Sequence, residues 1–242
     1  MKLLGRCILL ATTTLLCSQA QAGGLLTPHK AQYKVKISIV SGQLNTELRA
    51  TDGGYVANHV IRPTGFSRIL TRGTMDVTSE FTSAKDGVKP VAYRSVDTIR
   101  KDPDVDIAFN WDTNEVAGTV GDEKFMQKLD GIVYDSVSIQ YVLMHDLING
   151  GLNKQYTLFD IDKLKIANVH NVGKKQVKVG AGTFEAVGIR HQAEGSSRIT
   201  TLWCVEELGY LPVVIEQHRK GKLKFRASLQ KYTPTDELPP PH

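Results

Sequence analysis

The stretch Ser136–Ile148, with the sequence SVSIQYVLMHDLI, departs from the pattern that the rest of the chain follows. Its apolar residues recur at helical spacing, and they are Val137, Tyr141, Met144 and Ile148, with Ile139, Val142, Leu143 and Leu147 widening the stripe. Asp135 or Ser136 can cap the start of a helix here, and Asn149-Gly150-Gly151 can end it. An apolar stripe of this width predicts a helix that is mostly buried.

Most of the remaining chain alternates apolar and polar residues at period two, which predicts strands with one buried face. Tyr33, Val35 and Ile37 begin this pattern, and Leu223 and Phe225 open its last run. Further candidate strands are residues 43–50, 54–62, 73–83, 90–99, 104–111, 115–120, 124–129, 155–161, 164–171, 184–192, 198–205 and 211–219. About a dozen short strands separated by Gly-rich turns predict a mostly antiparallel β fold. We expect a curved sheet, or half-barrel, that encloses one main α-helix, residues 136–148.

The segment Ile199–Val205 has apolar residues at both sets of alternating positions, with Trp203 on one side and Leu202 and Cys204 on the other. A strand that is covered on both faces has this composition, whereas a surface strand does not. We therefore expect this strand to run beneath the helix or another covering element. Burial would also keep the Cys204 thiol unreactive.

The first 22 residues have the organisation of a signal peptide. Lys2 and Arg6 are followed by a short apolar run, and Ala20-Gln21-Ala22 provides small residues for cleavage after Ala22. Two alternatives are a retained membrane anchor and a lipoprotein acylated at Cys17, although Leu16 is larger than a lipoprotein signal favours. The prediction is an exported, periplasmic protein of the cell envelope.

The expected mature chain is one β-rich domain, residues 23–233, followed by a flexible Pro-rich tail, residues 234–242. Cleavage would leave Cys204 as its single cysteine, so the fold would depend on its apolar core rather than on a disulfide. The chain has a formal net charge of +5, with no basic arm or nucleic-acid-binding motif. We therefore expect no nucleic acid among its partners.

The sequence lacks the motifs that accompany common catalytic and cofactor chemistry. There is no G-x-S-x-G, H-E-x-x-H, C-x-x-C, phosphate-binding loop or dinucleotide fingerprint. No two histidines of the expected mature chain have the spacing of metal ligands on a helix, which leaves only a zinc site built from distant histidines as an alternative. We predict no catalytic residues, no metal and no cofactor.

The run Trp203–Pro212, with the sequence WCVEELGYLP, resembles the signature of an uncharacterised bacterial envelope family, the domain-of-unknown-function family numbered 3108. Asp135 and Ser138 at the helix start and Gly182–Val187 before a strand also fit this family, as do Asp86-Gly87, Pro90 and Tyr93. The resemblance covers about residues 30–232. It implies a strand-rich fold similar to the half-barrels of periplasmic lipoprotein carriers, which wrap a curved sheet around a helix and hold acyl chains.

Two sets of residues are candidates for binding. Five aromatic residues could line a cavity between sheet and helix, with core packing as the alternative, and they are Phe66, Trp111, Tyr141, Trp203 and Phe225. Six basic residues of a predicted hairpin could meet an anionic partner, with a solvated strand edge as the alternative, and they are His218, Arg219, Lys220, Lys222, Lys224 and Arg226.

These features favour a periplasmic binding or carrier module for an apolar or lipid-like ligand, such as an acyl chain. The basic hairpin would then dock to an anionic envelope surface or to an envelope protein. The main alternative is a structural or interaction protein of the envelope without a ligand, which would have a filled core. An enzyme is the third hypothesis, and it would need polar residues that converge in a cleft.

Overall fold

The computed structural model describes residues 25–37, 40–84, 86–160 and 163–235. Its strands are β1 His29–Ile37, β2 Val40–Thr51, β3 Gly54–Pro63, β4 Met75–Ala84, β5 Gly87–Asp97, β6 Val105–Asn110, β7 Glu115–Val120, β8 Glu123–Lys128, β9 Val133–Tyr134, β10 Gln155–Asp160, β11 Lys163–Val179, β12 Gly182–Ala193, β13 Arg198–Val205, β14 Leu211–Arg219 and β15 Lys222–Pro234. The helices are α1 Ser67–Leu70, α2 Ser138–Ile148 and the 3₁₀ turn η1 Glu206–Leu208. The predicted signal peptide, residues 1–22 with Cys17, lies outside the described residues, as do residues 236–242 of the predicted tail.

All fifteen described strands belong to one sheet, in the order β8-β7-β6-β5-β4-β3-β2-β1-β15-β14-β13-β12-β11-β10-β9. The chain starts at the centre with β1 and extends by hairpins to one end at β8. It then begins again at the other end with β9 and returns to the centre, where β15 pairs with β1. Every pair is antiparallel except β9 and β10, which are parallel neighbours with α2 between them in the chain. The predicted mostly antiparallel β fold is confirmed.

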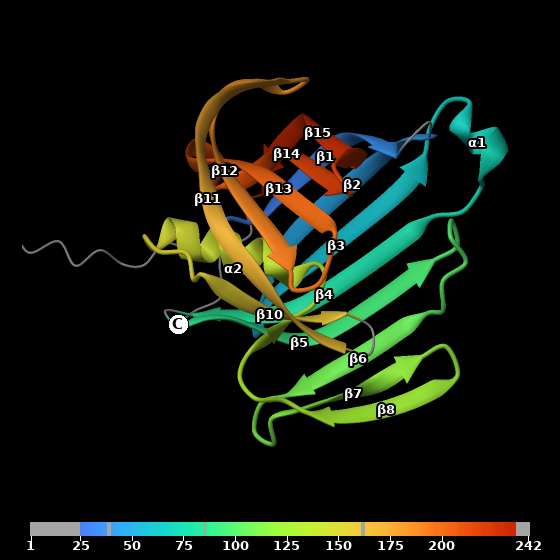
Figure 1. Cartoon of the computed structure of the whole chain (residues 1–242), viewed down its shortest axis with the longest axis vertical. Helices are drawn as coiled ribbons and strands as arrows, with labels where there is room; N and C mark the ends of the chain where they lie inside the picture. The colour runs from blue at the N-terminus through green and yellow to red at the C-terminus, as the bar shows by residue number, and fades with distance from the viewer. Residues whose placement is uncertain (1–24, 38–39, 85, 161–162, 236–242) are drawn as a thin grey trace, which may run out of the picture.

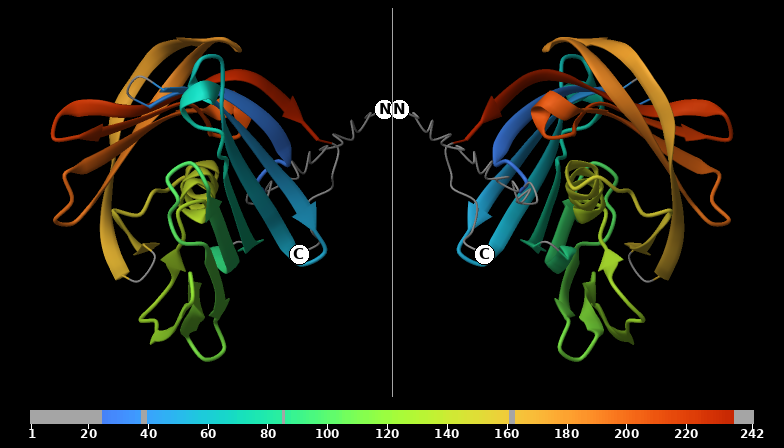
Figure 2. Two further views of the ribbon diagram at one scale, coloured as in Figure 1. Left: turned by 90° about the vertical axis from the view of Figure 1, so that its right-hand side faces the viewer. Right: turned by 90° about the vertical axis from the view of Figure 1, so that its left-hand side faces the viewer.

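The sheet bends around α2, as Figures 1 and 2 show from three directions. The helix lies in the concave side of the sheet, and every residue from Ser138 to His145 is buried. The predicted half-barrel around one main helix is therefore confirmed. The helix begins at Ser138 instead of residue 136, because the Asp135 carboxylate accepts hydrogen bonds from the N–H groups of Val137 and Ser138.

The two ends of the open sheet meet through aromatic side chains. Phe159 of β10 stacks on Phe125 of β8, with ring centroids 5.5 Å apart, and meets Phe109 of β6 edge-on at 6.4 Å. These rings belong to a second apolar cluster, separate from the main core, that also includes Val133 of β9. Among the described strands, β8 and β9 end the ladder without pairing to each other. Side-chain packing rather than backbone hydrogen bonds therefore closes the half-barrel on this side.

The β11–β12 hairpin is longer than the sequence predicts, because β11 continues past residue 171 to Val179. The pairing shifts between Asn171 and Lys174, where Gly173 has a φ of +93°. Beyond this bulge the hairpin reaches β15, and the Ala181 N–H donates to the Leu229 carbonyl oxygen at 3.2 Å. A bulge adds a residue to one strand and bends it, so a local irregularity lets one hairpin span several neighbouring strands.

The strand β13 is covered on both faces, as its composition predicts. Leu202 and Cys204 are buried in the core, and the Lys175 ammonium of β11 lies 3.6 Å from the centroid of the Trp203 ring. Burial raises the pKa of the Cys204 thiol well above its usual value. The signature that follows forms the corner to β14, where Gly209 takes a φ of +64°.

Candidate binding site

The space between α2 and the sheet is filled with side chains. Tyr141, Leu143 and Met144 of α2 are almost completely buried, and the Tyr141 ring stacks on Phe81 of β4 at 5.2 Å. Of the two best-formed hollows among the described residues, neither lies between helix and sheet. Neither hollow is the cavity predicted between helix and sheet, where the mostly apolar helix α2 packs directly against the concave side of the described sheet.

A buried carboxylate ties the start of α2 to the sheet. Oδ1 of Asp135 accepts from the N–H groups of Val137 and Ser138, both at 2.8 Å. Oδ2 accepts from the Ser79 hydroxyl of β4 at 2.7 Å and from the Ser138 hydroxyl at 2.8 Å. Burial raises the pKa of Asp135, while these hydrogen bonds act in the opposite direction. Asp135 therefore both caps the helix and fixes its position.

Further polar contacts hold the rest of the helix. The Tyr141 hydroxyl lies 3.2 Å from Nε2 of His59, and Nε2 of His145 donates to the Ala84 carbonyl oxygen at 3.0 Å. The Tyr156 hydroxyl donates to the Asp146 carboxylate at 2.5 Å. Along its length, α2 is thus connected to β3, to the end of β4 and to β10.

Two histidines that lie in the sheet predict how stability depends on pH. Burial lowers the pKa of both His59 and His191 to about 4, from 6.5. Below about pH 6.5 these two imidazoles take up protons in the unfolded chain but stay neutral in the folded chain. The protein should therefore lose stability as the pH falls from about 6.5 towards about 4. We expect a loss on the order of 1–3 kcal/mol for each histidine. The raised pKa of Asp135 acts in the opposite direction, because the folded chain then takes up a proton more readily than the unfolded chain. It should offset part of the loss of stability at acidic pH.

Urea unfolding between about pH 7 and pH 4.5 measures this dependence. The variants His59→Gln and His191→Gln should each have a shallower decline in the free energy of unfolding than the unmodified protein. Equal slopes in all three proteins would show that other groups control the acid sensitivity. His170→Gln is the matched control, since His170 is exposed on β11.

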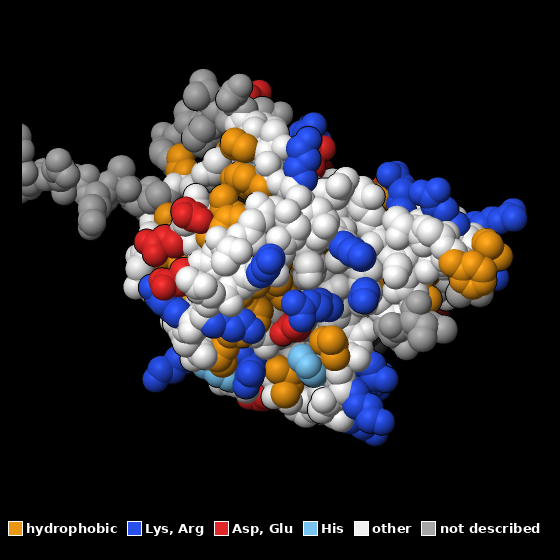
Figure 3. All heavy atoms as spheres, turned by 90° about the horizontal axis from the view of Figure 1, so that it is seen from above, with side chains coloured by type: hydrophobic (Ala, Val, Ile, Leu, Met, Phe, Trp, Pro, Cys, Tyr) orange, Lys and Arg blue, Asp and Glu red, His pale blue; other side chains and the backbone are white. Residues whose placement is uncertain are grey.

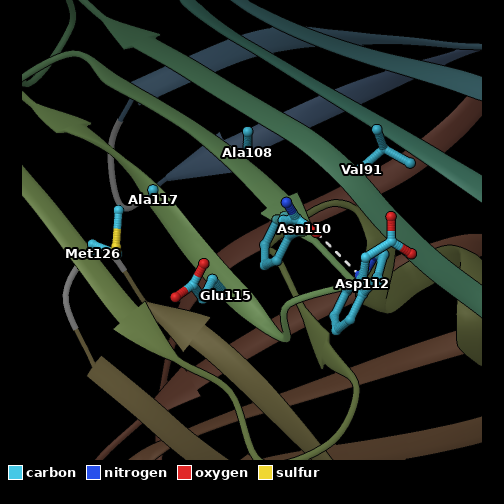
Figure 4. A pocket seen from close by; sticks show the side chains of 9 residues that line it. Val91, Ala108, Asn110, Asp112, Glu115, Ala117 and Met126 are labelled. Atoms are coloured by element: carbon cyan, nitrogen blue, oxygen red, sulfur yellow. Dashed lines mark hydrogen bonds between the residues drawn. The ribbon is translucent and has the colours of Figure 1, made fainter.

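The larger of the two hollows lies on β5 to β8 and on the turn that follows β6, and it has a volume of about 630 Å³. Figure 4 shows Ala108 and Ala117 on neighbouring strands, with Met126 on one side and Asn110, Asp112 and Val91 on the other. A second hollow of about 170 Å³ adjoins the first, because Val91 lines both. The larger hollow, which we call the groove, lies on the outer face, whereas the smaller one also touches Tyr55 and Phe81, whose rings belong to the main core around α2.

Strand register explains the floor of this groove. Ala92, Ala108, Ala117 and Met126 are direct neighbours across β5, β6, β7 and β8. They alternate with the inward-facing residues Ile107 and Phe109 and so share the outer face. Small side chains in three adjacent strands leave a depression, and Met126, which is 72% exposed, borders it.

Trp111 forms a fixed wall of the groove. Its indole N–H donates to the Pro90 carbonyl oxygen at 2.6 Å, and its ring stacks on Phe109 with centroids 5.7 Å apart and planes within 5°. Asn110 shapes the turn beside it, because its side-chain oxygen accepts from the N–H groups of Asp112 and Thr113. The protein's own contacts therefore hold this aromatic surface in place.

The structure does not bring the five predicted aromatic residues together. Tyr141 is in the filled interior, Phe225 packs at the margin of the main core, and Trp203 lies under Lys175. Phe66 is 73% exposed beside α1, so only Trp111 lines the groove. Alternation along one strand gives the face of a residue relative to its neighbours, but not which distant strands share a cavity with it.

The predicted basic hairpin is the β14–β15 turn with its flanking strands. Arg219 and Lys222 are direct neighbours across the two strands at the turn. Both residues are exposed, and so are Lys220 and Lys224. His218 is half-buried, and the Arg226 guanidinium is paired with Glu216 at 2.7 Å. Four of the six predicted residues therefore present a charge to solvent at one hairpin.

Two further observations concern metals and membrane helices. Within the described residues, no three His, Cys, Asp or Glu side chains are grouped so that they could hold a metal ion. No helix in the same part of the chain has the length and apolar character that a membrane crossing requires.

Comparison with known proteins gives a family and a fold. The chain is similar in structure to a beta-barrel-like protein of domain of unknown function DUF1849 from Brucella abortus, with a TM-score of 0.56 and 16% identity, over 87% of this chain and 99% of the other. No curated protein matches the sequence. Residues 30–226 match the family model described as protein of unknown function, DUF3108. The chain therefore belongs to the DUF3108 family, whose function is unknown, and it has a β-barrel-like fold.

Proposed function

We propose that this protein is a non-catalytic binding module of the cell envelope that holds an apolar, acyl-like group in the groove on the outer face of β5 to β8. The groove beside Trp111 carries this proposal, and the export signal predicted for residues 1–22 supports the location. The larger hollow has a volume of about 630 Å³ and is open towards solvent along one side, so a bound chain would be covered on its other faces only.

The composition of the groove supports an apolar ligand. Its floor is alanine, and its sides are Trp111, Val91 and Met126, with polar groups such as Asp112 and Glu115 at the margin. Burying such surface under a hydrocarbon chain stabilises a complex by about 25 cal/mol for each Å² removed from water. The adjoining smaller hollow extends the groove in one direction, which suits a chain better than a compact ring.

A variant that fills the groove tests this function. In Ala117→Leu the larger side chain should occupy the floor without removing any existing contact, and Trp111→Ala should remove the wall. Thr119→Leu is the control, because it places the same leucine side chain two residues farther along the same face of β7, outside the groove.

Protein that has been exported with its own signal and purified without detergent would be extracted with organic solvent and examined by mass spectrometry for stoichiometric lipid. A fluorescent fatty acid would then be added to each protein, so that a ligand lost in purification is not missed. We expect binding by the unmodified protein and Thr119→Leu, and at least about tenfold weaker binding by Ala117→Leu. Equal binding by all the variants, or none above an unrelated periplasmic protein, would refute the groove as a ligand site.

The filled interior favours a second candidate function, that of an envelope interaction protein without a ligand. A packed core and an edge strand β8 with an exposed Met126 are what this function needs. Crosslinking in the periplasm from a photoreactive residue at position 126 would then recover one specific partner, whereas the same residue at position 178 on β11 should not. Failure to recover any specific partner would count against this function.

A further inference from the structure

One rim of the half-barrel collects three loops that are distant in sequence. The strands β3, β2, β1, β15 and β14 are neighbours in that order, and at this rim β3 leads into α1, β1 leads into β2, and β14 leads into β15. The α1 loop is fixed to the start of β2, because the Ser41 N–H donates to the Ser67 hydroxyl at 2.9 Å and the Thr64 N–H donates to the Ser41 carbonyl oxygen at 3.0 Å. Three strand spacings, roughly 14 Å, separate β3 from β15.

This rim, which we call the basic rim, carries many exposed cations, and the acidic residue among them, Glu216, is paired with Arg226. Residues 62–72, 34–37 and 218–226 contain three, two and five Lys or Arg residues respectively, and no Asp or Glu. The exposed cations include Arg62, Arg68, Arg72, Lys36, Lys220, Lys222 and Lys224. Lys36 lies on β1 beside β15, where its direct neighbour Arg226 is paired with Glu216, so the free positive charge in this part of the rim comes from Lys36 and from the exposed residues of the β14–β15 turn.

The same rim carries four of the seven large apolar side chains that are exposed among the described residues. Phe66, just before α1, is 73% exposed, and Ile69 within α1 is 74% exposed. Ile37 is the last residue of β1, and Leu223 is the second residue of β15. Figure 3 shows apolar side chains at the right-hand end of the molecule, where Figure 1 places α1, with Lys and Arg side chains beside them. Apolar side chains at loop tips have no reason to gather on a surface that faces only water.

We propose that the basic rim docks the protein onto an anionic phospholipid bilayer, with the cations at the headgroups and Phe66, Ile69, Ile37 and Leu223 entering the interfacial layer. A soluble anionic polymer would explain the cations, but it would not explain the exposed apolar residues among them. A bilayer surface satisfies both, because it offers negative charge above an apolar layer. The proposal does not depend on the groove, which lies on other strands.

Flotation with vesicles tests the docking. The probes are vesicles of phosphatidylcholine that contain phosphatidylglycerol and vesicles of phosphatidylcholine alone, used with protein isolated after export. The charge variant combines Lys220→Gln, Lys222→Gln and Lys224→Gln, and its control combines Lys124→Gln, Lys154→Gln and Lys178→Gln, which are exposed elsewhere. The apolar variant combines Phe66→Ser and Ile69→Ser, and its control is Ile166→Ser, an exposed apolar side chain on β11 that belongs to neither the rim nor the groove. Thermal unfolding of every variant confirms that the fold is kept.

We expect the anionic vesicles to retain the unmodified protein and both controls. Binding should be about tenfold to a hundredfold weaker for the charge variant, and weaker for the apolar variant by about tenfold. Equal partition of the rim variants and their controls would refute the docking surface. So would equal binding to vesicles without phosphatidylglycerol, or loss in the charge variant alone with full binding by Phe66→Ser/Ile69→Ser. Ala117→Leu should still bind vesicles, so failure of the groove and failure of the rim are distinguishable.

Discussion

Replacing Asp135 by alanine should destabilise the protein by about 3–4 kcal/mol, because buried donors then lose their acceptor. The hydroxyl of Ser79 and the N–H groups of Val137 and Ser138 all donate to this carboxylate. Removal of a buried carboxylate offsets part of the effect, since burial disfavours its charged form. The free energy of unfolding in urea at neutral pH is the measurement.

Two controls separate the hydrogen bonds from a general effect of losing an aspartate. Asp135→Asn keeps an acceptor for the two N–H groups and gains a donor that a serine hydroxyl can accept, so we expect a loss of about 1 kcal/mol. Asp130→Ala removes an exposed carboxylate five residues earlier and should change stability by less than about 0.5 kcal/mol. If Asp135→Ala were as stable as Asp130→Ala, the carboxylate could not be what positions α2.

Phe159→Ala should have an effect of similar size, about 3–5 kcal/mol, because it removes the ring that joins the two ends of the sheet. Phe109 and Phe125 pack on this ring from β6 and β8, and the described sheet has no ladder between its two end strands to keep them together. Part of the lost stability should be confined to the strands that pack on this ring. Amide hydrogen exchange should accelerate in β6, β7 and β8 more than in β1 and β2.

Phe66→Ala serves as the control for Phe159→Ala, since the Phe66 side chain is 73% exposed and should contribute less than about 0.5 kcal/mol. A uniform acceleration of exchange across the whole sheet would contradict a local closure by side chains. It would indicate instead that the second apolar cluster unfolds together with the main core.

The helix α2 could be predicted from sequence because its signals are local. Spacing, capping by Asp135 and the stop at Asn149 all lie within a few turns of one another, and the structure confirms each. The two-residue strand β9 is too short to show any periodicity, and it exists only because Thr157 and Leu158 of β10 pair with it. The continuation of β11 past Gly173 could not be predicted, because a glycine followed by two lysines resembles the end of a strand until its partner β12 is known.

The groove could not be predicted from the sequence for a related physical reason. An outward-facing alanine is unremarkable on one strand, and a depression arises only where Ala108 and Ala117 become neighbours. Aromatic residues attract attention as ligand contacts, yet Tyr141 and Phe225 are used for packing. Trp111 was identified from its type alone, and its role as a wall depends on the Pro90 carbonyl oxygen that holds it.

The pairing of the first strand with the last governs how the chain can fold. β1 and β15 are hydrogen-bonded from His29 with Pro234 to Ile37 with Phe225, so their contacts join residues from opposite ends of the sequence. Contacts of such long sequence separation slow folding, because a large loop must close before they form. While a nascent chain emerges from its N-terminus, β1 can pair with β2 but has an open edge on its other side. The centre of the sheet cannot be completed until the last strand is available, and until then β1 keeps an open edge that favours aggregation.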